Sequence, residues 1–205
     1  MVGRSVTSRD LVLGRLRAAL AAGSPADPVP VPRDYRRAAD ADLDQLAQRL
    51  TDYRAHVHRV TEVGVADTIA GIVPAGGTVV VPPGLAPAWL PPTVTALPDD
   101  GLDHGRIGAA DGVVTAAAVA IAQTGTVVLD GSPDQGRRVL SLLPDLHVCV
   151  VRADQVVATV PEAIARLTPQ RPLTWISGPS ATSDIELIRV EGVHGPRRLH
   201  ILLLP

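Results

Sequence analysis

Two apolar stretches decide the fold: LHVCVV at residues 146–151 and LHILLL at residues 199–204. Each places apolar side chains at consecutive positions, so both faces of the predicted strand are apolar. Strands of this kind are typical of parallel sheets whose two faces are covered by helices. The two stretches therefore predict an α/β fold built around a largely parallel sheet.

The sequence between and before these stretches alternates short Val-rich segments with helical ones, which is the pattern of right-handed βαβ units. Further strands are predicted over 60–63, 78–81, 93–96, 126–129, 173–177 and 185–190, and helices over 67–73, 115–123, 135–143 and 154–167. Only about eight residues, including Gly192, Gly195 and Pro196, separate the last two predicted strands, and this favours an antiparallel hairpin. We therefore expect a mixed, mainly parallel sheet.

The first 60 residues have a different character. A helix is predicted over about 9–22 with Ser8 as its cap, and another over Asp40–Arg59. Between them, Gly23–Pro32 holds four prolines, which disfavour both a helix and a central strand. We expect an N-terminal helical arm with a Pro-rich strap over 1–60, not needed to form the sheet, and an α/β domain over 61–205.

Composition excludes several classes of function. The net charge of −2 and the 2% of aromatic residues give neither the field nor the stacking platforms of a nucleic-acid binder. A single cysteine, Cys149, excludes an internal disulfide, a Cys-rich zinc site and a four-cysteine iron–sulfur cluster within this chain. Glycine-rich nucleotide motifs and the serine-hydrolase motif are missing, and no apolar run approaches the ~18 residues of a membrane span. A cytoplasmic protein without its own metal or cofactor is expected.

Three segments are candidates for binding a carboxylate, phosphate or hydroxy-acid ligand: Ser177–Asp184, Thr124–Thr126 and Gly192–Arg198. Small hydroxyl residues and glycines at strand ends expose N–H and O–H donors, and a histidine or arginine can clamp an anion. Each segment also fits a plain structural role, as a capped turn, a helix–strand junction or a hairpin turn. The candidate ligand-binding residues are Thr124, Gly125, Thr126, Ser177, Gly178, Ser180, Thr182, Asp184, His194 and Arg197.

The first two segments are predicted to line one concave site, although about 50 residues separate them. The Asp130-Gly131-Ser132 turn could hold a ligand or cap the element that follows it. No residue is assigned a catalytic role. Cys149 lies within an apolar strand, where a thiol is usually inert.

Four stretches taken together resemble the LUD (lactate utilization) domain of the lactate utilization protein C (LutC/YkgG) family. They are IAQTGTVVL at 121–129, LSLLP at 140–144 followed by His147, ISGPSATSDIE at 176–186 and GVHGPR at 192–197. The chain departs from the family's pattern at Gln123, where an acid is usual, and at Ala181, where an arginine is common.

The resemblance implies a fold similar to the NagB/RpiA/CoA-transferase group. It also implies a non-redox subunit of a system that oxidises L-lactate to pyruvate, with iron–sulfur clusters in partner proteins. Two alternatives remain: a stand-alone enzyme of the same fold that acts on small anions (an isomerase, a CoA transferase or a cyclo-ligase-like protein), and a pure interaction protein. Neighbouring genes encoding cysteine-rich cluster proteins would favour the subunit.

Overall fold

The computed structural model describes residues 7–23, 30–182, 190–191 and 195–205. The chain divides into two compact units, Met1–Tyr35 and Arg36–Pro205. The first unit contains α1 (Ser8–Ala22), in which no residue is buried. Its cap is Thr7, whose hydroxyl accepts from the backbone of Asp10 in a capping box, and not the predicted Ser8.

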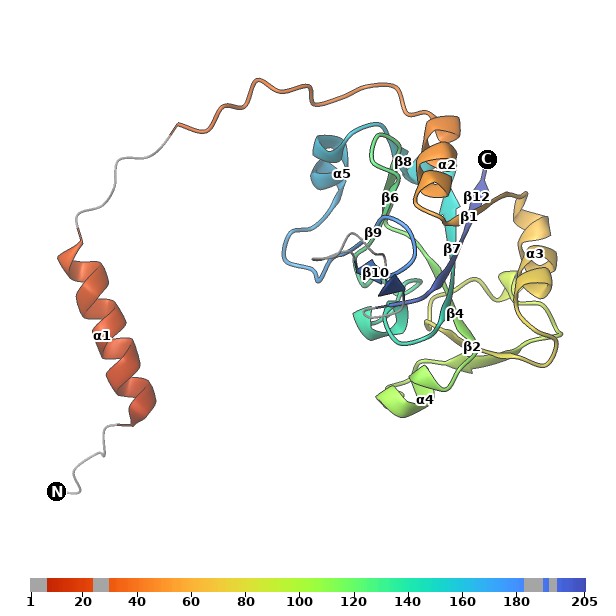
Figure 1. The fold of residues 1–205 in the computed structure, drawn as a ribbon, viewed down its shortest axis with the longest axis horizontal. Helices are drawn as coiled ribbons and strands as arrows, with labels where there is room; N and C mark the ends of the chain where they lie inside the picture. Colours follow the sequence, from red (N-terminus) through yellow and green to blue (C-terminus); the bar gives the residue numbers. More distant parts are fainter. Residues whose placement is uncertain (1–6, 24–29, 183–189, 192–194) are drawn as a thin grey trace. The chain divides into compact units, whose positions relative to one another are not determined.

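A parallel sheet forms the centre of the second unit (Figure 1). Its six described strands follow the order β1 (His56–Arg59), β12 (Arg198–Leu204), β7 (Leu146–Arg152), β4 (Gly112–Ala116), β2 (Thr78–Val81) and β3 (Thr95–Pro98). Every neighbouring pair is parallel. The predicted α/β class with a mainly parallel sheet is therefore confirmed.

The predicted antiparallel hairpin at the end of the chain is wrong. β12 lies between β1 and β7 and runs parallel to both. β11 (Val190–Glu191) pairs instead with β10 (Ala181–Thr182) in a separate two-stranded ribbon. A short connection allows a hairpin but does not require one, and the apolar β12 is buried more completely in the middle of the sheet. The rest of the strand predicted over 185–190 lies outside the described residues.

A second sheet follows the order β8 (Val156–Val157), β5 (Val119–Ile121), β6 (Thr126–Leu129) and β9 (Thr174–Ile176). β5 and β6 are antiparallel, as are β6 and β9. The helix predicted over 115–123 is therefore wrong, because this segment ends β4 and forms β5. Alanine has the highest intrinsic helix propensity, but the difference per residue is small, and burial between two layers outweighs it.

Helices cover both faces of the main sheet. On one face, alternate residues of β12 (Leu199, Ile201) join α2 (Leu43–Asp52) and the second sheet in one core cluster. On the other face, Leu202 packs with α3 (Val65–Ile72). α5 (Val160–Arg166) covers the outer face of the second sheet. The two-sided burial predicted for the apolar strands is confirmed.

The remaining described elements are short. They are η1 (Glu62–Gly64), η2 (Pro87–Trp89), α4 (His104–Gly108), η3 (Arg138–Ser141) and η4 (Ala153–Gln155). The helices predicted over 135–143 and 154–167 correspond to the single turn η3 and to α5 preceded by η4 and β8. The first of these segments is therefore mostly loop.

Residue 60 does not mark a structural boundary. The helix predicted over Asp40–Arg59 ends at Asp52, and His56–Arg59 form an edge strand of the main sheet. Leu46 and Leu50 of α2 are fully buried in the core. Residues 36–60 therefore contribute to the α/β unit, which the arm predicted over 1–60 did not anticipate.

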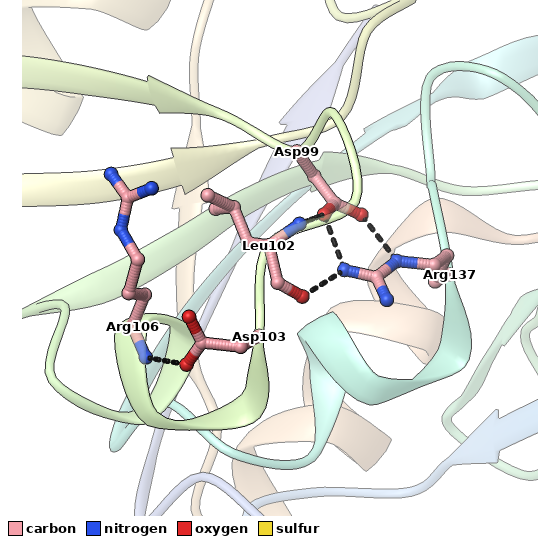
Figure 2. Close-up of polar contacts among 5 residues, drawn as sticks. All are labelled: Asp99, Leu102, Asp103, Arg106 and Arg137. Carbon is pink, nitrogen blue, oxygen red and sulfur yellow. Dashed lines mark hydrogen bonds and ion pairs between the residues drawn. The ribbon is translucent and has the colours of Figure 1, made fainter.

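A bidentate ion pair ties the loop before η3 to the end of β3 (Figure 2). Arg137 donates from Nε and Nη2 to the two carboxylate oxygens of Asp99, and Nη2 also donates to the carbonyl of Leu102. Asp99 further accepts from the backbone N–H of Leu102. These hydrogen bonds fix the chain just before the residues that lead into β7.

Candidate functional site

The two segments predicted to share a site are neighbours. β6 and β9 pair so that Thr126 and Ser177 lie opposite each other, and their hydroxyl oxygens are 2.8 Å apart. The hydroxyls of Thr124 and Thr126 are also 2.8 Å apart. The three hydroxyls thus form one chain, which joins the segments by mutual hydrogen bonds.

The two glycines of these segments are explained by packing. Gly125 has φ +59°, and a Cβ there would lie 2.6 Å from Cβ of Arg49 in α2. Gly178 has φ +97°, and a Cβ there would lie 2.6 Å from the carbonyl oxygen of Tyr53, the C-cap of the same helix. Both turns therefore approach the end of α2 at a distance that only glycine allows.

The other candidate residues are dispersed. The Ser180 N–H donates to the carbonyl of Pro196 at 2.8 Å, which joins the turn after β9 to the segment before β12. Arg197 forms an ion pair with Asp145. The backbone of Thr182 lies in β10. Asp184 and His194 lie outside the described residues. Ligand binding by this set stays a prediction.

A cavity of about 260 Å³ opens at the amino ends of β7 and β12; we call it the His147 cavity. Of the predicted residues, Gly178 and Ser180 line it, and Thr124–Thr126 do not. The two segments predicted to line one concave site are therefore joined by the chain of hydroxyls, but only the segment that contains Gly178 and Ser180 reaches the cavity. The other polar or aromatic side chains on its wall include Ser141, His147, Thr174 and Trp175.

His147 is the buried polar group of this cavity. It is 1% exposed, and its Nε2 lies 2.8 Å from Oγ1 of Thr115, which is fully buried on β4. Burial lowers the pKa of His147 to about 4, so the ring is neutral at physiological pH. Sequence reasoning did not select this residue as a site. The signal available was a histidine at the second position of an otherwise apolar strand.

A second cavity, of about 520 Å³, lies beyond the carboxyl ends of β2, β4 and β6; we call it the Asp134 cavity. Burial raises the pKa of Asp134 above its usual value. Asp130 and Ser132 also line it, and both accept hydrogen bonds from Nη1 of Arg171. The Asp130-Gly131-Ser132 turn therefore lines this cavity and does not cap a helix. Asp134 was missed because nothing in its local sequence marks it.

Cys149 is fully buried in β7, and burial raises the pKa of its thiol to about 12. Its Sγ is 3.6 Å from the carbonyl oxygen of Ala116. Within the described part of the chain, no group of three or more His, Cys, Asp or Glu side chains is arranged to hold a metal ion. Nor does any helix there combine the length and apolar character needed to cross a membrane.

Comparison with protein families matches the LUD domain to residues 104–204. A protein of Deinococcus radiodurans named "Lactate utilization protein C" is 47% identical over 182 residues, which are 86% of this chain and 85% of that protein. A Bacillus subtilis protein of the same name is 36% identical over 99 residues, 44% of this chain and 41% of that protein.

Among solved structures, a DUF162 family protein from Deinococcus radiodurans superposes with a TM-score of 0.68 at 40% sequence identity. The match covers 80% of this chain and 96% of that one. The similarity therefore extends well beyond the residues matched to the LUD domain.

Proposed function

Because the chain belongs to the lactate utilization protein C family, we propose that it acts in L-lactate utilization, as the non-redox cytoplasmic subunit of a system that oxidises L-lactate to pyruvate. The observation that carries this proposal is the 47% identity to the Deinococcus radiodurans protein over 86% of the chain. The oxidation itself is assigned to partner proteins that hold iron–sulfur clusters.

The cysteine chemistry supports this division of labour. A [4Fe–4S] cluster is normally held by four thiolates, whereas this chain has one cysteine. Burial of Cys149 in β7 raises its pKa to about 12, so it is a poor source of a thiolate ligand. The residues present do not fit a cluster.

Growth on L-lactate tests the proposed role. A strain lacking this gene should fail to grow with L-lactate as sole carbon source and should grow normally on pyruvate, because the step lost precedes pyruvate. The intact gene supplied in trans should restore growth. Normal growth of the deletion strain on L-lactate would contradict the proposal.

A dye-reduction assay tests the division of labour. The purified chain should contain no stoichiometric iron and should not reduce a dye with L-lactate, and addition of the iron–sulfur partner proteins should start the reaction. Stoichiometric iron or robust lactate-dependent dye reduction by the chain alone would place redox chemistry here.

The Asp134 cavity favours a second candidate, a stand-alone enzyme acting on a small anion. Open α/β sheets bind ligands beyond the carboxyl ends of their strands, and a carboxyl group whose pKa is raised suits acid–base work there. Turnover of a sugar phosphate or of a CoA thioester by the isolated chain, lost in Asp134→Asn, would favour this candidate.

A further inference from the structure

Two polar side chains on the wall of the His147 cavity have unused hydrogen-bonding capacity. Thr174 is 9% exposed and His147 is 1% exposed, so both are at least nine-tenths buried. Among the described residues, neither the Thr174 hydroxyl nor Nδ1 of His147 has a hydrogen-bond partner. Every fully enclosed side-chain nitrogen or oxygen among the described residues has a hydrogen-bond partner. The two unpaired atoms are therefore partly accessible, and the cavity that both residues line provides this access.

The contact with Thr115 determines which ring nitrogen of His147 carries the hydrogen. Thr115 is fully buried, and its hydroxyl hydrogen needs an acceptor, because an unpaired buried O–H costs about 1–3 kcal/mol. Two acceptors lie next to it, Nε2 of His147 at 2.8 Å and the sulfur of Cys149, and the ring nitrogen is the stronger acceptor of the two. A neutral imidazole that accepts at Nε2 carries its hydrogen on Nδ1. The ring therefore presents an N–H donor to the cavity.

The cavity thus holds two donors, His147 Nδ1–H and the Thr174 hydroxyl, on a wall that includes apolar side chains such as Ile176 and Leu199. Donors in such a setting suit a ligand with acceptor oxygens. The volume of about 260 Å³ equals roughly nine water molecules at ~30 Å³ each, which is ample for a three-carbon acid.

We propose that the His147 cavity binds a small 2-oxo or 2-hydroxy carboxylic acid, with His147 and Thr174 donating to oxygens of its carboxylate and of the neighbouring carbon. The choice of acid rests on the proposed role in L-lactate utilization, and the two donors rest on the geometry. The oxygen on the carbon next to the carboxylate distinguishes this class from plain carboxylates, and the planar carboxylate distinguishes it from tetrahedral phosphate.

Trp175 provides a local reporter of occupancy. It lines the cavity and is 43% exposed, whereas the other tryptophan, Trp89, is 2% exposed and donates to Glu62. A ligand in the cavity should change the fluorescence of Trp175 alone, and Trp175→Phe should abolish the change while calorimetry still detects binding.

The experiment titrates the full chain with pyruvate, L-lactate, propanoate and inorganic phosphate. Propanoate has the same carbon chain as pyruvate but lacks the second oxygen. Pyruvate or L-lactate should bind at least about tenfold more tightly than propanoate, which is the value of one hydrogen bond in such a site, and should also bind more tightly than phosphate. Equal binding of all four, or no binding of any, would overturn the proposal.

Variants then test the two donors. Thr174→Val preserves the shape and His147→Gln removes the Nδ1 donor, so each should weaken pyruvate binding about tenfold or more. His147→Asn keeps an N–H close to the Nδ1 position and should bind within a few-fold of the native protein. Thr68→Val makes the same substitution on α3, at a residue that does not line the His147 cavity, so it is the matched control and should leave binding unchanged. Full pyruvate affinity in both donor variants would place the ligand elsewhere, and loss of affinity in Asp134→Asn would place it in the Asp134 cavity.

Circular dichroism and thermal unfolding of each variant show whether it is folded, and Thr174→Val remains informative if a His147 variant is not. Growth on L-lactate distinguishes failure of the binding-site inference from failure of the proposed function. If the gene is required for growth but the protein binds none of the acids, this inference fails and the proposed function stands. If the protein binds pyruvate but the gene is dispensable, the proposed function fails.

Discussion

Gly125 and Gly178 have a structural role that local sequence could not reveal. Glycine beside hydroxyl residues at a strand end is the pattern of an anion site, and it is equally the pattern of a turn that another element approaches closely. The approaching element, the end of α2, is more than 70 residues away from Gly125 in sequence and was predicted as part of a separate arm. Only the fold shows that contact.

Alanine at these two positions should destabilise the protein. A positive φ costs a non-glycine residue about 1–3 kcal/mol, and the added methyl group must also displace α2. Gly76→Ala is the matched control, since Gly76 has φ +77° and open space around it. Urea denaturation should show Gly125→Ala and Gly178→Ala losing more stability than Gly76→Ala. Equal losses in all three would mean that the approach to α2 is unimportant.

At the scale of elements, the apolar strands were predictable because consecutive burial leaves a direct pattern in sequence. The strand predicted over 126–129 and the stretches at 146–151 and 199–204 correspond to β6, β7 and β12. The helix predicted over 115–123 was wrong, because short buried apolar runs have no periodicity that distinguishes a strand from a helix. Strand order was also beyond the sequence, since it depends on contacts between distant segments.

The Asp99–Arg137 ion pair joins two segments of the fold, and mutation can measure its contribution to stability (Figure 2). The Asp99 side chain is 2% exposed, so Arg137→Met leaves a buried carboxylate with fewer donors and should cost about 1–3 kcal/mol at neutral pH. The Arg137 hydrogen bonds hold the pKa of Asp99 below its usual value. Their stabilisation is therefore present above the unfolded-state pKa and is lost as pH falls through the folded-state pKa.

Urea denaturation at several pH values checks this. The difference between the native protein and Arg137→Met should be largest at neutral pH and should shrink in acid. Arg106→Met, on α4, is the control, because Figure 2 draws no hydrogen bond or ion pair between the Arg106 side chain and Asp99. A pH-independent difference, or an equal loss in Arg106→Met, would contradict the role given to the ion pair.

For the whole molecule, the structure moves the start of the α/β unit from the predicted residue 61 to Arg36. A chain that begins at Arg36 should unfold cooperatively with a melting temperature close to that of the full chain. A chain that begins at Thr61 lacks α2, with its buried Leu46 and Leu50, and lacks β1. Each lost leucine costs about 2–5 kcal/mol, comparable with the whole stability of a domain.

Thermal unfolding followed by far-UV circular dichroism compares the two shortened chains. Loss of the cooperative transition only in the chain from Thr61 is the expected result. A sharp transition in that chain would show that α2 and β1 are accessories, as the sequence alone had suggested.

The position of β12 between β1 and β7 has a consequence for synthesis. β1 pairs with β12, which leaves the ribosome roughly 140 residues later. At about 5–20 residues per second, the nascent chain waits roughly 7–30 seconds with the edge of β1 unpaired and the core beneath α2 unfilled. During this interval the growing polypeptide exposes apolar surface and an unpaired strand edge. Its yield in the cell should therefore depend on chaperones that hold unfolded chains, more than the stability of the folded protein would suggest.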